Sequence, residues 1–309
     1  MSALGRHAQE YLRLRHGLGH DLGDAVRLLP RFVAYLDSIG APTITVQHAL
    51  TWVQRPDADP ASTVWARRMT VARGFARHMS GIDPATQIPP LGLVTYQPRR
   101  RPPFIYSTTD VQALMAAVPT IIPTELRAAT FQTLIGLLAA TGLRVGEAIR
   151  LERSDIDWAD GVLVIRGSKF HKSREVPVDS TTVSALADYA SIRDRRVPRP
   201  SSPTFFVSQK GTPVIYTVFG EKFREFVTES QVGAGSSTRP RIHDLRHSFA
   251  VQTLVRWYQN GDDVAALLPR LSTYLGHLEP AYTYWYLSAA PELLALAAAR
   301  LEPAARERQ

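Results

Sequence analysis

The sequence has no cysteine and no long apolar run. The absence of cysteine from its 309 residues excludes disulfides, thiolate metal sites and a cysteine nucleophile. No apolar run approaches the roughly 20 residues that a membrane-spanning helix needs. The first ten residues also lack the apolar core of a secretory signal. We therefore expect a cytoplasmic protein that has no membrane partner and whose mature form is the whole chain.

Lysine is also scarce, although the chain is basic. The formal net charge is +8, and nearly all the basic residues are arginines. A basic balance of this kind favours a polyanionic partner, with nucleic acid as the first candidate. The alternative is that a charge of this size has no bearing on a partner. The lysines, each a candidate for a specific role, are Lys169, Lys172, Lys210 and Lys222.

The first 90 residues are predicted to be helical. Apolar residues recur with a period near 3.6 over residues 21–39, where Pro30 predicts a kink or a break. Further helices are expected over residues 43–52, with Thr43 or Thr45 as the cap, and over residues 60–79. The last of these carries four candidate phosphate contacts: Arg67, Arg68, Arg73 and Arg77. A solvated helix face is the alternative interpretation of these arginines.

A proline-rich stretch separates this region from the rest of the chain. Prolines recur over residues 84–103, and such sequences form extended, semi-rigid spacers. We therefore divide the chain into a helical domain over 1–90, a linker over 91–104 and a second domain over 105–309. The linker carries three further candidate DNA contacts, with a merely soluble linker as the alternative: Arg99, Arg100 and Arg101.

The second domain is predicted to be mainly α-helical with one small β-hairpin. Cap residues at 107–110, followed by apolar periodicity, and a long helical pattern over about 124–140 indicate two helices, the second ending at residues 141–142. Two β-branched runs within residues 162–178 flank a basic turn and indicate a hairpin. Helical patterns continue to the end of the chain, where residues 290–302 form an apolar helix.

Four segments of the second domain carry residues suited to phosphate chemistry. Arg144 follows Gly142 at a predicted helix start, where a guanidinium can donate two hydrogen bonds to phosphate, and Glu147 is placed to hold it. Lys169 lies in the hairpin turn. The other two segments are a His-x-x-Arg pair and a Leu-Gly-His triplet with a tyrosine nine residues on: His243 with Arg246, and His277 with Tyr286. Each segment alone is common in proteins, where such residues lie on the surface or pack in the core without a catalytic role.

Together and in this order, the four segments resemble the tyrosine recombinase (phage integrase) family. The resemblance covers about residues 105–300, and the N-terminal helices are similar to the core-binding domain of that family. Residues 284–289, Tyr-Trp-Tyr-Leu-Ser-Ala, are similar to recombinases carried by transposon-like elements. The positions that match the family's catalytic set are Arg144, Lys169, His243, Arg246, His277 and Tyr286.

Two positions depart from the family pattern or have alternatives. The family often has Gly-Lys-Gly in the hairpin, whereas this chain has Ser168-Lys169-Phe170. Alignment on Val176-Pro177-Val178 places Lys169 at the catalytic position, with Lys172 as the alternative and as a candidate DNA contact. Tyr282 and Tyr284 also lie close, but only Tyr286 has the usual distance from His277.

The resemblance implies the reaction. Tyr286 attacks a DNA phosphate to give a 3′-phosphotyrosine and a free 5′ hydroxyl, while Arg144 and Arg246 neutralise the phosphate oxygens. His243 acts as base or proton shuttle, His277 donates a hydrogen bond to phosphate, and Lys169 protonates the leaving oxygen. The ester conserves the energy of the broken bond, so we expect no metal and no other cofactor.

The resemblance also implies partners and a biological setting. The substrate is double-stranded DNA, and four protomers, of one kind or of two, assemble on two DNA sites. The tail over residues 290–302 docks on a neighbouring protomer, with packing on its own domain as the alternative. The predicted function is site-specific recombination or integration for a mobile genetic element. The alternatives are a DNA-binding accessory protein that has lost the chemistry, and a type IB topoisomerase-like strand transferase.

Overall fold

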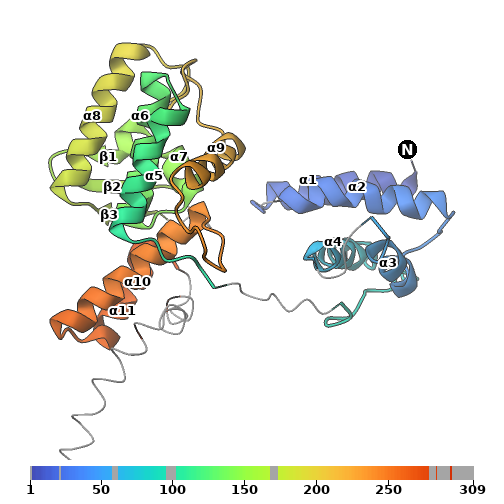
Figure 1. Cartoon of the computed structure of the whole chain (residues 1–309). Helices are drawn as coiled ribbons and strands as arrows, with labels where there is room; N and C mark the ends of the chain where they lie inside the picture. The colour runs from blue at the N-terminus through green and yellow to red at the C-terminus, as the bar shows by residue number, and fades with distance from the viewer. Residues whose placement is uncertain are drawn as a thin grey trace, which may run out of the picture. The chain divides into compact units, whose positions relative to one another are not determined.

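The computed structural model of the chain describes residues 2–20, 22–57, 62–94, 102–167 and 173–277, together with Thr283 and Leu293 (Figure 1). Within these residues the chain is mostly helical and has a single small sheet, as the sequence predicts. The chain divides into two compact units, residues 1–100 and 101–309. Among the described helices, none is both long enough and apolar enough to pass through a membrane.

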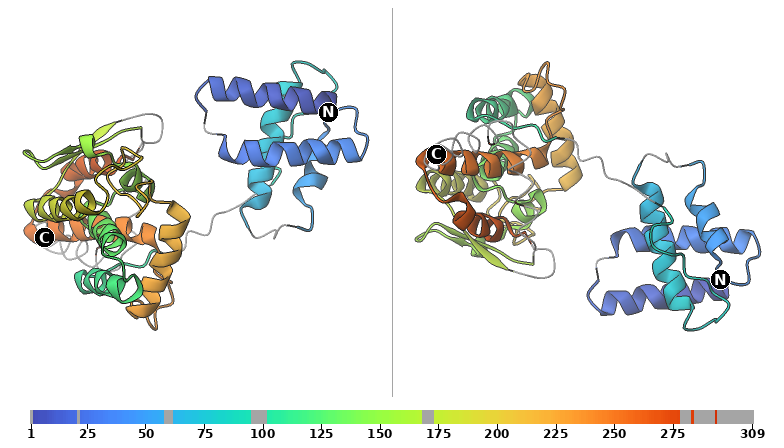
Figure 2. Two further views of the ribbon diagram at one scale, coloured as in Figure 1. Left: turned by 90° about the horizontal axis from the view of Figure 1, so that it is seen from above. Right: turned by 90° about the horizontal axis from the view of Figure 1, so that it is seen from below.

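The first unit is a group of helices around one apolar core. Helices α1 and α2 run side by side, and α4 crosses both of them while contacting α3 (Figures 1 and 2). The core between them contains the fully buried rings of Phe32 and Phe75. The helices are α1 (Ala3–Gly17), α2 (Gly23–Ser38), α3 (Val46–Val53) and α4 (Val64–Met79).

Local signals set the starts of α1 and α3, which Ser2 and Thr45 cap, whereas the break that is one of the two outcomes expected at Pro30 does not occur. Thr45 caps α3, because its side-chain oxygen accepts a hydrogen bond from the backbone N–H of His48 at 3.1 Å. Pro30, in contrast, neither breaks nor divides α2, which is one continuous helix from Gly23 to Ser38. Proline removes one intrahelical hydrogen bond, and the burial of neighbours such as Leu29 and Phe32 offsets that loss.

Helix α6 is the central element of the second unit. It contacts α5, α7, α8 and α10, and nine of its residues are buried. A helix surrounded on several sides buries residues around most of its circumference, which explains why the buried residues of α6 do not fall on a single face. The helices of this unit are α5 (Thr108–Ile121), α6 (Glu125–Thr141), α7 (Val145–Arg150), α8 (Ser180–Arg196), α9 (Tyr216–Glu229), α10 (Ile242–Asn260) and α11 (Val264–Leu275).

The predicted hairpin is confirmed as two antiparallel strands, β2 (Val162–Ile165) and β3 (Arg174–Pro177). A short strand that the sequence did not indicate, β1 (Ile156–Asp157), follows the 3-10 turn η1 (Arg153–Asp155) and pairs with β2 to complete the sheet. Two residues are too few to show an alternating pattern, so β1 leaves no signal in the sequence. The turn residues 168–172, with Lys169 and Lys172, lie outside the described residues.

Among the helices of the second unit that end at left-handed glycines, α6 and α10 differ in the surroundings of that glycine. Gly142 ends α6 with a φ of 61°, and Gly261 ends α10 with a φ of 81°. A Cβ atom on Gly142 would meet the ring of Phe249 at 2.6 Å, whereas one on Gly261 would meet nothing within 4 Å. The end of α6 is therefore packed so closely that only glycine fits there.

The C-terminal tail contributes to the core in the one place where it is described. Leu293 is buried against residues of α10 and α11, including Leu254, Leu268 and Leu271. This contact within one chain agrees with the alternative in which the tail packs on its own domain. The rest of the predicted tail helix lies outside the described residues.

These two glycines give a matched test of close packing. Both Gly142→Ala and Gly261→Ala place a side chain at a left-handed position, which costs about 1 kcal/mol. Gly142→Ala also forces Cβ against Phe249, and overpacking of this kind costs a further 1–3 kcal/mol, roughly. We expect thermal or urea unfolding to show the larger loss of stability for Gly142→Ala. Equal losses for the two variants would contradict the packing described for α6.

Candidate functional site

The end of α6 positions the first of the predicted site residues. The chain reverses at Gly142, and Arg144 then becomes the residue that precedes α7, as predicted. The Arg144 guanidinium donates to the Glu147 carboxylate at 2.8 Å and to the carbonyl of Gly276 at 3.0 Å. Its side chain is 34% exposed. A guanidinium has five N–H donors, so donors of Arg144 remain available to a ligand from solvent.

Glu147 lies behind Arg144 and binds a second arginine that the sequence analysis did not select. Its side chain is 3% exposed, and its two oxygens accept from both terminal nitrogens of Arg174, at 3.1 and 2.8 Å. The same carboxylate accepts from the backbone N–H of Arg144 at 3.0 Å. Glu147 therefore carries one negative charge between two guanidinium groups.

The pKa of Glu147 reflects this balance. Burial raises the pKa of the carboxyl group, but the hydrogen bonds and charge of Arg174, followed by those of Arg144, outweigh the burial and lower the pKa to about 2. A buried carboxylate that lost these partners would be strongly destabilising. Glu147 is therefore ionised at pH 7.

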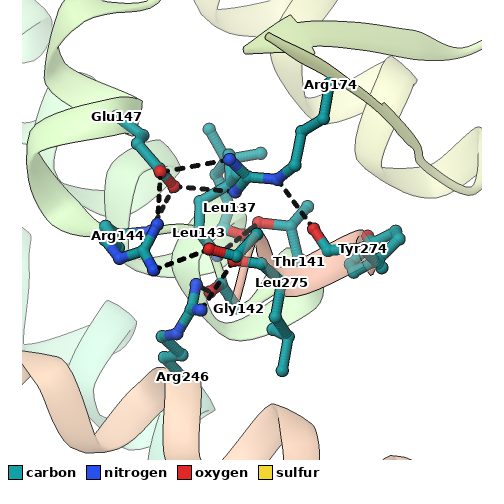
Figure 3. A network of polar contacts seen from close by, with 11 residues as sticks. Leu137, Thr141, Gly142, Leu143, Arg144, Glu147, Arg174, Arg246, Tyr274 and Leu275 are labelled. Atoms are coloured by element: carbon teal, nitrogen blue, oxygen red, sulfur yellow. Dashed lines mark hydrogen bonds and ion pairs between the residues drawn. The ribbon is translucent and has the colours of Figure 1, made fainter. Parts of the chain in front are cut away.

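The third arginine, Arg246, reaches the same place from α10. Its guanidinium is buried and donates to the carbonyl of Gly142 at 2.8 Å and to that of Leu275 at 2.6 Å. These carbonyls stand at the ends of α6 and α11, where the helix dipole is negative and favours a cation. Figure 3 shows the three arginines around these two helix ends, with Glu147 between Arg144 and Arg174.

Three histidines adjoin the arginines. Burial, and then the charges of Arg246 and Arg144, lower the pKa of His277 to about 4. Burial, and then His243 and Arg246, lower the pKa of His247 to about 3, and the His243 and His247 rings meet edge to face at 4.8 Å. Loss of water and the charge of Arg246 also lower the pKa of His243, although this residue keeps an exposed surface. All three imidazoles are therefore neutral at pH 7.

The structure thus brings four of the predicted residues together: Arg144, His243, Arg246 and His277. Tyr286, Lys169 and Lys172 lie outside the described residues. One contact leads toward the tyrosine, because Nδ1 of His277 lies 2.8 Å from the hydroxyl oxygen of buried Thr283, three positions before Tyr286 in the sequence.

Arg174 and His247 are the members of this cluster that the sequence analysis did not select. His247 lies four positions after His243, so the two share a helix face, and this spacing was a signal that could have found it. Arg174 gives no such signal. It lies 27 positions from Glu147, and only the folding of the hairpin against α7 brings the two together.

The four candidate DNA contacts of α4 differ in their surroundings. Arg68 is buried and pairs with Asp57 at 2.7 Å, and Arg73 donates to the carbonyls of two prolines at 2.8 and 2.9 Å. Arg67 pairs with Asp24 at the surface, and Arg77 is exposed in the last turn of α4. Arg68 and Arg73 therefore hold the unit together. The linker arginines Arg99, Arg100 and Arg101 lie outside the described residues.

Comparison with known proteins gives a consistent family match. The model of the phage integrase family matches residues 106–292. A protein of Sinorhizobium fredii that is named as an integrase/recombinase, y4rB, is 43% identical over 312 residues, which cover 98% of each chain. These matches include the elements that carry Arg144, Arg174 and Arg246, which we call the arginine cluster.

Solved structures show the same fold at much lower identity. The integrase of the Tn1549 transposon, solved with transposon right-end DNA, superposes with a TM-score of 0.64 at 16% identity, covering 97% of this chain and 99% of the other. A lambda integrase tetramer bound to a Holliday junction superposes with a TM-score of 0.61 at 14% identity, covering 92% of this chain and 76% of the other.

The Glu147 carboxylate predicts a specific pH dependence of stability. Its pKa in the folded chain, about 2, lies below its ordinary value of 4.5. Its ionised form therefore stabilises the fold above pH 4.5, and this contribution is lost as the pH falls from 4.5 to 2. By linkage the contribution at neutral pH is about 3 kcal/mol. We expect Glu147→Gln to lower the free energy of unfolding at pH 7 and to approach wild type near pH 2.

A matched control is Glu221→Gln, since Glu221 is exposed on α9 and surface changes of this kind usually stay within about 0.5 kcal/mol. Unfolding would be followed by urea titration at several pH values. A stability difference between wild type and Glu147→Gln that did not change between pH 7 and pH 2 would contradict the assigned ionisation.

Proposed function

We propose, from the premise that this chain belongs to the phage integrase family and is a site-specific tyrosine recombinase, that Tyr286 is its nucleophile and that the arginine cluster at the ends of α6 and α11 binds the DNA phosphate that Tyr286 attacks. The observation that carries the proposal is the convergence of Arg144, Arg246 and His277 on those two helix ends. These are residues that the family's motif order selects.

The charge of the cluster suits a phosphodiester in a displacement reaction. Arg144, Arg174 and Arg246 supply three positive charges and Glu147 one negative charge, so the cluster carries a net charge of +2 while the histidines are neutral. A phosphodiester binds with one negative charge and gathers more on its non-bridging oxygens as the nucleophile approaches. Fixed donors aimed at that charge lower the barrier because they need no reorganisation.

The same field favours the tyrosine nucleophile. A phenol has an ordinary pKa of about 10 and attacks phosphate only as its proton leaves. Nearby positive charge stabilises the phenolate and lowers that pKa. His243 is neutral because burial and Arg246 lower its pKa, so its ring can accept the proton. His243 is therefore assigned as the base or proton shuttle.

His277 is assigned as a hydrogen-bond donor to the phosphate. Its Nδ1 lies 2.8 Å from the Thr283 hydroxyl. When that hydroxyl donates to Nδ1, the ring proton resides on Nε2, and this N–H can donate a hydrogen bond to a phosphate oxygen. A neutral histidine donates in this way without adding charge. Thr283 thereby sets the tautomer of His277 and links it to the segment that carries Tyr286.

Lys169 completes the reaction as the acid that protonates the leaving 5′ oxygen, with Lys172 as the alternative. A lysine on a hairpin turn is a point charge that can give up a proton. Cleavage leaves a 3′-phosphotyrosine and a 5′ hydroxyl. Because the ester conserves the energy of the broken bond, a 5′ hydroxyl of another strand can reverse the reaction and join the two strands.

The first unit is proposed to contact the DNA backbone. Arg67 and Arg77 are the arginines of α4 with exposed side chains, and the linker adds Arg99, Arg100 and Arg101. Contacts to phosphates position a protein on duplex DNA without reading its sequence, and they weaken as salt rises. The complexes of the transposon integrase with DNA and of the lambda integrase tetramer with a junction support an assembly of four protomers on two DNA sites.

The covalent intermediate is the direct test of this proposal. We expect wild-type protein, incubated with duplex DNA carrying the ends of the genetic element that encodes it, to form an adduct that survives denaturation. The adduct forms with EDTA present, because no step uses a metal. Tyr286→Phe removes only the hydroxyl and should abolish the adduct. Gel mobility after denaturation, with nuclease digestion and mass spectrometry of the modified peptide, is the measurement.

Tyr284→Phe is the matched control, since Tyr284 lies two positions away in the same aromatic run. It should retain the adduct. An adduct that persists in Tyr286→Phe and disappears in Tyr284→Phe would transfer the nucleophile to Tyr284. DNA binding by wild type without any adduct would instead support an accessory protein that has lost the chemistry. Relaxation of supercoiled DNA without exchange between two sites would support a topoisomerase-like activity.

A further inference from the structure

The side chain of Arg174 bonds to Glu147 and to the carbonyl of Tyr274, and so to one support of Arg144 and to the chain segment that carries the other. We infer that Arg174 is a positioning residue, which fixes the phosphate-binding arginine by holding α7 and the end of α11 to the hairpin strand β3. This inference rests on the proposed function in one respect, namely that Arg144 binds the reacting phosphate. Nε, Nη1 and Nη2 of Arg174 all donate to Tyr274 or Glu147, so this guanidinium acts as a support rather than as a phosphate ligand.

The supports of Arg144 are a carboxylate and a backbone carbonyl. Nη1 of Arg144 donates to Glu147, and Nη2 donates to the carbonyl oxygen of Gly276. Arg174 holds the first directly, through two hydrogen bonds to the Glu147 carboxylate. It holds the second through the chain, because its Nε donates at 2.8 Å to the carbonyl oxygen of Tyr274, two residues before Gly276.

The backbone of α11 is shaped to accept this side chain. Gly276 ends α11 in the left-handed conformation, with a φ of 68°. A Cβ atom on Gly276 would lie 2.8 Å from Nη1 of Arg174, so any side chain there would displace the guanidinium. The glycine therefore serves two needs: it allows the turn that presents its carbonyl to Arg144, and it leaves the space that Arg174 fills.

Arg174 also begins strand β3, in register with Ile165 of β2. One side chain thus connects the hairpin, α7 and α11, which lie far apart in the sequence. The geometry needs a planar group with three donors in a fixed fork, two toward the carboxylate and one toward the carbonyl. Lysine has the charge but not the fork, so Arg174→Lys should keep the electrostatic field and lose the connection.

Arg166, which directly follows the other strand of the same hairpin, is a natural control. It follows β2 and pairs through Nε with the buried carboxylate of Asp155. Its side chain is 63% exposed, however, and Asp155 belongs to η1, next to β1, rather than to the ends of α6 or α11. Arg166→Lys therefore makes the same chemical change, in the same hairpin, without touching a support of Arg144.

The connection can be tested on the full chain without DNA by amide hydrogen exchange. Arg174→Lys should increase exchange in residues 145–150 and 271–277, which are distant from position 174 in sequence, with α8 as the internal reference. Arg166→Lys should increase exchange only in residues 153–166. If exchange in Arg174→Lys rises only within β2 and β3, or rises equally in α8, the inference is wrong. Arg174→Met, which keeps the apolar stem, is the second variant should the lysine variant not fold.

The consequence for the reaction is then measured as the rate of covalent adduct formation on the DNA used for wild type. Misplacement of a catalytic group by about 1 Å can cost roughly 100-fold in rate. We expect Arg174→Lys to form the adduct at least about tenfold more slowly than wild type. Its DNA affinity should stay within about twofold of wild type, because the charge is kept. Arg166→Lys should react at the wild-type rate.

An Arg174→Lys protein with altered exchange in α7 and α11 that cleaves at the wild-type rate would overturn the positioning role. So would a loss of DNA affinity that accounts for the whole rate defect, because Arg174 would then act through its charge. Failure of the wild-type protein to form any adduct would count against the proposed nucleophile, and hydrogen exchange would still decide whether Arg174 connects the three elements.

Discussion

Two guanidinium groups share the buried carboxylate of Glu147, and the geometry of the site follows from that arrangement. A carboxylate that is 3% exposed is tolerable only when its charge is matched and its oxygens are hydrogen-bonded. Arg174 donates hydrogen bonds to this carboxylate from the interior, and Arg144 donates to it from the side that faces solvent. Because Glu147 is buried and cannot move into water, it holds Arg144 in one orientation.

The ends of α6 and α11 supply the other half of the arrangement. Each helix finishes at a left-handed glycine, so its last carbonyls point outward at the negative end of the helix dipole. Arg246 binds a carbonyl from each end, and Arg144 binds one from α11. The arginines are thus ordered by the protein before any phosphate arrives. Such preorganisation is the condition under which electrostatic stabilisation of a transition state is most effective.

The sequence was sufficient to select four residues that the structure brings together, and Glu147 as one support of Arg144, but it did not indicate Arg174. Arg144, His243, Arg246 and His277 stand at fixed spacings from turn-forming glycines or from each other, so local pattern finds them, and the structure places them in one cluster. The helix ends at Gly142 and Gly276 are also marked locally, since a left-handed residue after a helix favours glycine.

What the sequence could not predict depends on contacts between distant segments. Arg174 reaches Tyr274 across 100 positions, and no periodicity records such a pairing. Arg68 and Arg73 lie on the same helix as Arg77, yet they differ from it because they bond to Asp57 and to two proline carbonyls of the first unit. In the sequence, a helical arginine that bonds to its own domain cannot be distinguished from one that stays exposed. Pro30 is a third example, because packing of its neighbours outweighs its local preference.

The measurement that tests the account most directly is an experimental structure of the full-length Tyr286→Phe protein on uncleaved DNA. The account predicts that the scissile phosphate lies within hydrogen-bonding distance of the Arg144 and Arg246 guanidiniums and of His277, and that the bonds from Arg144 to Glu147 and from Arg174 to Glu147 are unchanged from the free protein. A phosphate bound elsewhere, or an Arg144 that leaves Glu147 to reach it, would contradict the claim that the protein orders this site before DNA binds.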